Sequence, residues 1–235
     1  MMGAVRAALL LLLTACGRVG FDARAFDDGA SPDGAIVDHD VLAFAPCGTT
    51  VLLADEFDDG VPGPFVVSTE PRMTVDEANG TMNVTFAPSV PAGRYGWYRT
   101  ATVYPTDGLC VTLAPVQAGD GGVVYMKLRT DEVEAEWFAR PASGLLDLRT
   151  RQGSVPTVRD SIPYDLAVDR FWRLRQHGNT TLWETSTDGV QYRTHGVFAG
   201  VFPAATAHLE FGAGAYENVT NAGVARFASV VITGP

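Results

Sequence analysis

From Thr49 onward, apolar and polar residues alternate in short runs separated by glycine-, asparagine- and aspartate-containing turn signals. Alternation with a period of two is typical of half-buried strands. No long segment has apolar residues spaced with the period of a helix. Asn79-Gly80, between runs at 73–77 and 81–86, is a strong hairpin signal, and Asp188-Gly189 marks another turn. The pattern therefore predicts an all-β domain.

Further strands are expected at residues 51–54, 94–104, 109–114, 122–129, 133–139, 145–149, 170–177, 180–186, 208–213 and 225–232. About a dozen strands in one segment, with neither an internal repeat nor a second linker, are typical of a sandwich. We therefore expect one antiparallel two-sheet domain over residues 47–235.

The N-terminus carries a different pattern, an apolar run at 7–13 that ends in Leu13-Thr14-Ala15-Cys16. The run is shorter than the roughly 20 residues that cross a bilayer. The motif resembles the lipobox of bacterial lipoproteins, which implies a signal peptide at 1–15 and acylation of Cys16, with palmitate as a typical chain. The expected location is the bacterial cell envelope, and Gly17 favours the outer membrane. The alternative is an ordinary secretory signal or an uncleaved buried segment.

Residues 16–46 are rich in Asp, Gly and Ala and follow neither hydrophobic period, so we expect a flexible acidic linker. The whole chain has a formal net charge of -10, and Lys127 is its one lysine. Nucleic-acid binding needs clustered positive charge, so this balance argues against a nucleic-acid partner. A monomer attached to the membrane by its lipid is expected.

The three cysteines become an even set once Cys16 is assigned to lipid. Cys47 and Cys110 are then predicted to form a disulfide in an oxidising compartment. Two buried thiols are the alternative.

Three stretches together resemble concanavalin A-like lectin/glucanase domains: 53–60, 171–175 with 181–189, and 209–214 before 225–230. The resemblance extends over residues 49–233 and is closest to noncatalytic domains of bacterial carbohydrate-active and surface proteins. In those domains a Ser-x-Asp-Gly turn, here Ser186 to Gly189, precedes an aromatic residue, here Tyr192 instead of the commoner Trp. The resemblance implies a jelly-roll sandwich and a noncatalytic carbohydrate-binding or adhesion module.

Glu132, Glu134 and Glu136 would share one face if they belonged to one strand. Retaining glycosidases use two carboxyl groups about 5–5.5 Å apart. The segment is similar to the glutamate-x-aspartate-x-glutamate strand of laminarinase-like glucanases, which implies Glu132 as nucleophile, Glu136 as acid/base and Glu134 in place of the aspartate. The favoured interpretation is a charged strand face held by cross-strand Glu–Arg pairs. A structural envelope domain that binds another protein is a third hypothesis.

Other polar and aromatic residues are candidates for a sugar-binding groove, since sugar hydroxyls bind charged groups and sugar faces stack on aromatic rings. The candidates are Trp97, Tyr98, Tyr125, Arg129, Glu134, Arg149, Arg173 and Arg175. For Trp97 and Tyr98, core packing is the favoured alternative. Asp55, Asp58 and Asp59 could contribute to a structural calcium site, against a favoured turn-capping role. No other cofactor is expected.

Overall fold

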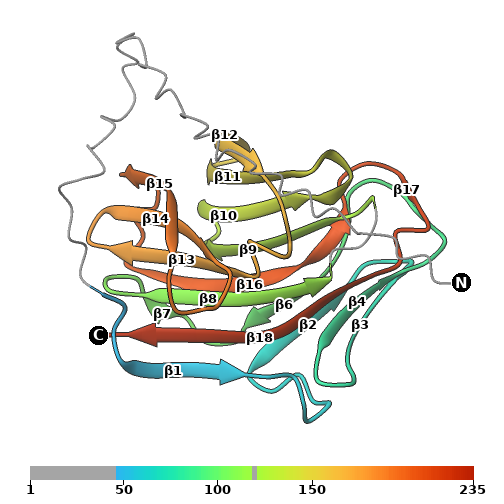
Figure 1. Ribbon diagram of the computed structural model, residues 1–235, viewed down its shortest axis with the longest axis horizontal. Coiled ribbons are helices and arrows are strands. Elements are labelled where there is room, and N and C mark those ends of the chain that lie inside the picture. Colours follow the sequence, from blue (N-terminus) through green and yellow to red (C-terminus); the bar gives the residue numbers. More distant parts are fainter. Residues whose placement is uncertain (1–45, 118–120) are drawn as a thin grey trace, which may run out of the picture. The chain divides into compact units, whose positions relative to one another are not determined.

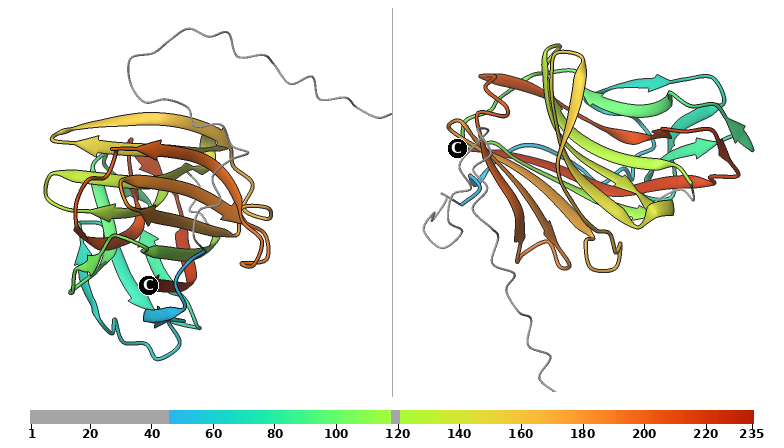
Figure 2. Two further views of the ribbon diagram at one scale, coloured as in Figure 1. Left: turned by 90° about the vertical axis from the view of Figure 1, so that its left-hand side faces the viewer. Right: turned by 90° about the horizontal axis from the view of Figure 1, so that it is seen from above.

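Two antiparallel sheets lie face to face in the computed structural model, which describes residues 46–117 and 121–235 (Figures 1 and 2). The predicted signal peptide, Cys16 and nearly all of the predicted linker lie outside the described residues. Within the described ranges, no helix is long and apolar enough to cross a membrane. The prediction of an all-β, two-sheet sandwich is confirmed.

Sheet A joins strands that are far apart in sequence. Its spatial order is β15 (Arg193–Ala199), β14 (Thr180–Ser186), β13 (Phe171–His177), β8 (Cys110–Gln117), β18 (Val224–Gly234), β4 (Met82–Phe86) and β3 (Met73–Glu77). The first strand, β1 (Thr50–Asp55), pairs with the end of the last strand, β18, so that Thr50 lies opposite Gly234. The domain therefore begins and ends side by side (Figure 1).

Sheet B contains the strands on which the candidate site is built. Its spatial order is β12 (Val155–Pro163), β11 (Leu145–Gln152), β10 (Val133–Arg140), β9 (Val123–Arg129), β16 (Thr206–Ala215), β6 (Arg94–Thr100) and β2 (Phe65–Thr69). The short β7 (Tyr104–Pro105) also pairs with β16, β5 (Ser89–Val90) pairs with β17 (Val219–Thr220), and a 3-10 turn, η1, covers Pro141–Ser143.

The core lies between the sheets and is filled by the side chains at every second position of each strand, which point inward. Alternate residues of β9 and β10, such as Met126, Leu128 and Ala135, are buried there. Two indoles span the layers: Trp137 Nε1 donates to the carbonyl of Arg173 (3.1 Å), and Trp183 Nε1 donates to the carbonyl of Glu136 (3.0 Å). Each indole thus buries its ring and still satisfies its N–H donor.

The predicted disulfide between Cys47 and Cys110 is confirmed, with the two Cα atoms 5.6 Å apart. Cys110 is the first residue of β8, so the bond fastens the segment before β1 to the middle of sheet A.

The predicted Asn79-Gly80 hairpin is also confirmed. Both residues have positive φ, 58° and 70°, as a two-residue type I′ turn requires.

Candidate functional site

Three cross-strand rows of side chains follow from the register on the outer face of sheet B, the face directed away from sheet A. An aromatic row consists of Trp97, Gly212, Tyr125, Phe138 and Asp147. A central row consists of Arg99, Glu210, Lys127, Glu136 and Arg149. A distal row consists of His208, Arg129, Glu134 and Arg151. Five adjacent strands thus bring together residues as far apart in sequence as Trp97 and Gly212.

The aromatic row forms a small apolar cluster outside the main core. Tyr125 and Phe138 are buried in it together with Val123, and Tyr95 and Trp97 pack against them half-buried. Glycines on the intervening strand β16 permit this packing, because a Cβ at Gly214 would overlap the ring of Tyr95 and one at Gly212 would overlap the backbone of β6. The cluster is therefore seated directly on the sheet, and its rings form a partly open apolar surface.

Arg149 and Tyr216 extend this aromatic surface. The Arg149 guanidinium lies 3.5 Å from the centre of the Phe138 ring, and Tyr216, 54% exposed, packs edge-on against the same ring at 5.7 Å. Tyr216 also lines a hollow of about 150 Å³ with Val123 at the start of β9. A second hollow, of about 310 Å³, is lined by Arg129 at the end of the same strand.

Two carboxylates in the central and distal rows share three cations. Glu210, 2% exposed, pairs with Lys127 (3.1 Å) and Arg129 (2.8 Å). Glu134 pairs with Arg151 (2.9 Å) and, at longer range, with Lys127 (3.5 Å) and Arg129 (3.8 Å). Burial by itself would raise the pKa of Glu134, but the hydrogen bond from Arg151 and the positive charges around it bring that pKa below its ordinary value. The predicted cross-strand Glu–Arg pairs are confirmed.

Asp147 is held in the same way at the end of the aromatic row. Arg140 (2.9 Å) and Arg149 (2.8 Å) donate to its two oxygens, and Ser161 donates at 2.7 Å. Burial opposes ionisation, but these three donors outweigh it and lower the pKa of Asp147. The Asp147 carboxylate therefore fixes the guanidinium of Arg149 over Phe138.

Glu136 behaves differently from the other carboxylates, although it lies between Lys127 and Arg149 in the central row. Within the described residues its side chain has no hydrogen bond or ion pair. Burial raises the pKa of Glu136 to about 7, with further raising by Glu134 and Glu210 and only partial compensation from Lys127 and Arg149. This carboxyl group can therefore donate or accept a proton near neutral pH.

Glu132 does not belong to this face, so the predicted row of three carboxylates on one strand is wrong. Thr130 and Val133 close a turn by a backbone hydrogen bond of 2.9 Å, and the Thr130 hydroxyl accepts from the backbone N–H of Glu132. Strand β10 begins only at Val133, after this turn. Glu132 is consequently exposed in the β9–β10 hairpin, and only Glu134 and Glu136 share the strand face.

The side chains of Trp97 and Tyr98 lie on opposite faces of sheet B, because consecutive strand residues point to opposite sides of a sheet. Trp97 joins the aromatic row, whereas Tyr98 is 1% exposed and stacks on Phe65 in the core with ring centres 5.4 Å apart. The prediction of Tyr98 as a ligand-binding residue is therefore wrong.

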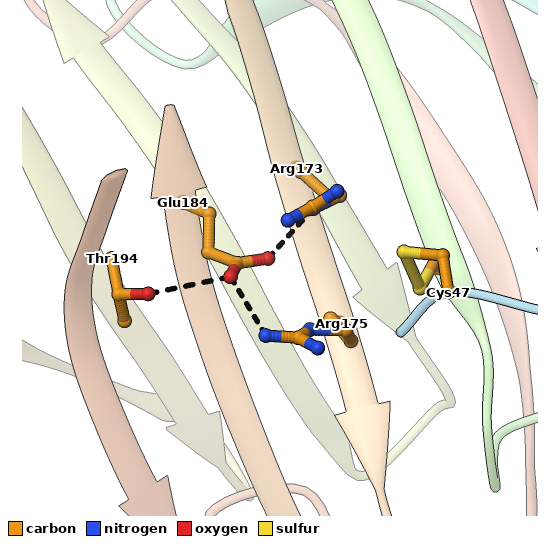
Figure 3. Close-up of a disulfide and its surroundings, with 6 residues drawn as sticks. Cys47, Arg173, Arg175, Glu184 and Thr194 are labelled. Atoms are coloured by element: carbon orange, nitrogen blue, oxygen red, sulfur yellow. Dashed lines mark hydrogen bonds and ion pairs between the residues drawn. A yellow bond between two sulfur atoms is a disulfide. The ribbon is translucent and has the colours of Figure 1, made fainter. Parts of the chain in front are cut away.

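Arg173 and Arg175 lie on sheet A, so the single groove predicted to contain them together with Tyr125, Arg129 and Arg149 is wrong. They lie on β13 and both donate to Glu184 on β14, at 2.6 and 2.8 Å, and Thr194 on β15 also donates to Glu184 (Figure 3). The ring of Tyr192, which follows the Ser186 to Gly189 turn, covers the Arg173 guanidinium at 3.5 Å. This cluster fastens three strands of sheet A to one another.

Of the three aspartates considered for calcium, Asp55 is the last residue of β1, and Asp58 and Asp59 lie in the loop that follows it. Asp55 and Asp59 accept hydrogen bonds from the backbone N–H groups of Phe57 (2.8 Å) and Val61 (2.9 Å), so both act as turn caps. Among the described residues, no group of three or more His, Cys, Asp or Glu side chains is arranged to hold a metal ion.

Several members of the outer face were not selected from the sequence: Tyr95, Arg99, Phe138, Arg151, His208 and Tyr216. Tyr95 and Arg99 could have been found, since they stand two residues either side of Trp97 and share its face. The others become neighbours only through strand pairings that the sequence does not reveal.

No protein-family model matches this chain, and no curated protein matches it either. Solved structures do match. The endo-β-1,3-glucanase of Pyrococcus furiosus aligns with a TM-score of 0.58 at 8% identity, over 78% of this chain and 94% of that enzyme. The Crh5 transglycosylase aligns with a TM-score of 0.57 at 13% identity, over 80% and 85% of the two chains.

A third match is SCLam, a non-specific endo-β-1,3(4)-glucanase of family GH16, with a TM-score of 0.56 at 10% identity, over 78% of this chain and 90% of that one. At such low identities the likeness shows the fold alone. The chain has a concanavalin A-like jelly roll of the kind found in GH16 glucanases and transglycosylases.

Proposed function

We propose that this domain binds carbohydrate on the outer face of sheet B as a noncatalytic module. The observation that carries the proposal is the half-buried ring of Trp97, which packs on buried Tyr125 and Phe138 beside two rows of charged side chains. Sugar rings stack on aromatic faces, and their hydroxyls accept hydrogen bonds from guanidinium groups and donate hydrogen bonds to carboxylates. The fold, which is that of several carbohydrate-active enzymes, supports a carbohydrate-related function.

The two hollows indicate how a glycan would lie. Val123 and Arg129, which line one hollow each, stand at opposite ends of β9. Six residue steps along a strand correspond to about 20 Å. An extended oligosaccharide lying along β9 would therefore reach from the Tyr216 hollow, past the aromatic row, to the Arg129 hollow.

A glycan array probed with the full chain tests this proposal. Trp97→Ala is expected to weaken binding to the best ligand at least tenfold, about 1.4 kcal/mol. Tyr192→Ala, an aromatic substitution on sheet A, is the matched control and is expected to leave affinity unchanged. Equal affinity of the Trp97→Ala variant and the parent protein, or no glycan bound by the parent protein, would contradict the proposal. Absence of glycan binding by the parent protein would favour the hypothesis of a structural envelope domain that binds another protein.

Glycoside hydrolysis is the second candidate function, and Glu136 is the observation that favours it. A carboxyl group with a pKa of about 7 is suited to general acid/base work near neutral pH. Against it, Glu132 lies in a turn and Glu134 is neutralised by Arg151, so neither is placed as an obvious second carboxylate beside Glu136. Release of reducing ends from the array ligands by the full chain, abolished in Glu136→Gln, would establish hydrolysis over simple binding.

We further propose that the mature protein is held at the bacterial outer membrane by acyl chains on Cys16. The support is the Leu13 to Cys16 motif and its resemblance to a lipobox. Two or three acyl chains give stable attachment, whereas one chain binds only marginally.

A further inference from the structure

The hollow at the distal end of β9 is lined mainly by cationic and polar groups. Its walls include Arg99 from β6, Arg129 from β9 and His208 from β16, and Asp131 from the β9–β10 turn is also part of its lining. Three separate strands of sheet B thus direct basic side chains to one place on the outer face.

Arg99 lacks an acidic partner, unlike most of its basic neighbours. Within the described residues, its guanidinium makes no ion pair or hydrogen bond and instead lies 5.0 Å from the centre of the Trp97 ring. Glu210 is opposite Arg99 in the register but is already paired with Lys127 and Arg129 on its other side. An always charged guanidinium with unused donors therefore lines the hollow.

Arg129 also retains donor capacity, and one ring nitrogen of His208 has no partner among the described residues. Nη1 of Arg129 donates to Glu210 at 2.8 Å, which uses one of the five N–H donors of that guanidinium. His208 Nδ1 lies 2.8 Å from the carbonyl oxygen of Thr100, and a carbonyl only accepts, so Nδ1 carries a proton.

The wider face has the same excess of positive charge. Lys127, Arg129 and Arg151 surround Glu134 and Glu210, Arg140 and Arg149 surround Asp147, and Arg99 has no acidic partner. With Glu136 and Asp131 also counted, six cations stand against five carboxyl groups, and burial raises the pKa of Glu136 to about 7. This excess arises in a chain whose formal net charge is -10. An acidic protein that collects unneutralised cations on one face has a surface suited to an anionic ligand.

We propose that this hollow is a subsite for an anionic substituent, a sulfate ester or a carboxylate, on the glycan that the outer face binds. The inference rests on the proposed carbohydrate binding and specifies the class of glycan. Trp97 and Arg99 are two residues apart on β6, about 7 Å along the strand. A sugar ring stacked on Trp97 can therefore place its charged substituent against the Arg99 fork, where bidentate hydrogen bonds to sulfate or carboxylate oxygens form.

Binding of the full chain to two matched pairs of polymers tests the subsite: a sulfated galactan with its desulfated form, and a polyuronate with its carboxyl-reduced form. At low salt, at least one acidic polymer is expected to bind ten or more times more tightly than its neutral form, and added salt should reduce that preference. The pair that shows the preference identifies the substituent. Equal binding of acidic and neutral forms in both pairs would overturn this inference but leave carbohydrate binding intact, whereas no binding to any polymer would overturn both.

Two variants separate the subsite from general charge. Arg99→Gln is expected to lower affinity for the acidic polymer at least tenfold more than affinity for the neutral polymer, and His208→Asn is expected to lower the preference less. Arg94→Gln, at the other end of β6 and paired with Glu70 at 3.0 Å, is the matched control and should retain the full preference. An unchanged preference in Arg99→Gln, with its melting temperature close to that of the parent, would overturn the inference.

Discussion

At the scale of single residues, the outer face of sheet B shows how environment separates chemically identical groups. Glu134 and Glu136 are two residues apart on one strand, yet the pKa of the first is lowered and that of the second is raised to about 7. The difference follows from the partners: Arg151 donates directly to Glu134, whereas Glu136 is desolvated without such a donor. A glutamate-rich stretch alone does not reveal which carboxyl will be neutral.

The raised pKa of Glu136 predicts a specific pH dependence of stability. The folded protein holds this proton above the ordinary value of 4.5, so the stabilisation is complete below about pH 4.5 and is lost as pH rises through about 7. Glu136→Gln mimics the protonated form. Denaturant unfolding should therefore show the variant gaining up to about 3 kcal/mol over the parent protein between pH 4.5 and pH 8.

Glu134→Gln is the matched control for that experiment, and its sign is opposite. Because the pKa of Glu134 is lowered, its charged form stabilises the fold above its ordinary pKa, and that contribution disappears as pH falls through the lowered value. The control variant should be less stable than the parent at pH 7 and approach it under acid conditions. A constant stability difference for Glu136→Gln across pH would contradict the assignment.

At the scale of strands, most of the elements could be predicted from hydrophobic alternation and from turn residues. The predicted strands from 73–77 to 225–232 correspond to observed ones, with ends displaced by a few residues, because at least one face of each is buried or half-buried. The missed strands are short or lie near a sheet edge. Strand β12 contains Pro156 and Pro163, and all of its side chains are exposed or half-buried, so it lacks the alternation that burial imposes. The order in which the strands pair cannot be predicted from the alternation either. The predicted groove therefore combines Arg173 and Arg129, which lie on different sheets.

The glycines of β16 provide a test of how this strand supports the aromatic row. Gly214→Ala should lower the free energy of unfolding by about 1–3 kcal/mol, because the new methyl group overlaps the Tyr95 ring. The same substitution in a Tyr95→Ala background should cost less than about 1 kcal/mol, since the ring is gone. Equal costs in both backgrounds, measured by chemical denaturation, would show that the ring contact is not the cause.

At the scale of the whole molecule, the first and last strands of the sandwich pair with each other, and a disulfide fastens the segment before the first strand to β8. The bond joins residues separated by 63 positions, a loop for which chain entropy gives about 4 kcal/mol of stabilisation. Replacing both Cys47 and Cys110 by Ser should lower the melting temperature by about 5–15 °C. Reductant should lower the parent protein to a similar value and leave the double variant unaffected, and identical melting of both proteins would contradict this role.

The proposed anchor can be tested in bacterial cells that express the full chain. Cys16→Ser should abolish labelling by a clickable palmitate analogue and move the protein out of the membrane fraction, because the acyl chains have no other attachment point. Cys47→Ser, which removes a different cysteine, should retain both the label and the membrane fraction. Persistence of Cys16→Ser in the membrane fraction, with labelling intact, would contradict lipid attachment at this residue.

The Cys47–Cys110 bond also decides how the domain would bear mechanical load. Without it, tension arriving from the N-terminal side would act first on β1, an outlying strand that could peel away from the end of β18 one hydrogen bond at a time. With it, tension reaching Cys47 passes directly to the first residue of β8, which is paired on both sides by β13 and β18. The oxidised domain therefore receives a pull at its centre, where several strands resist together, and β1 is spared.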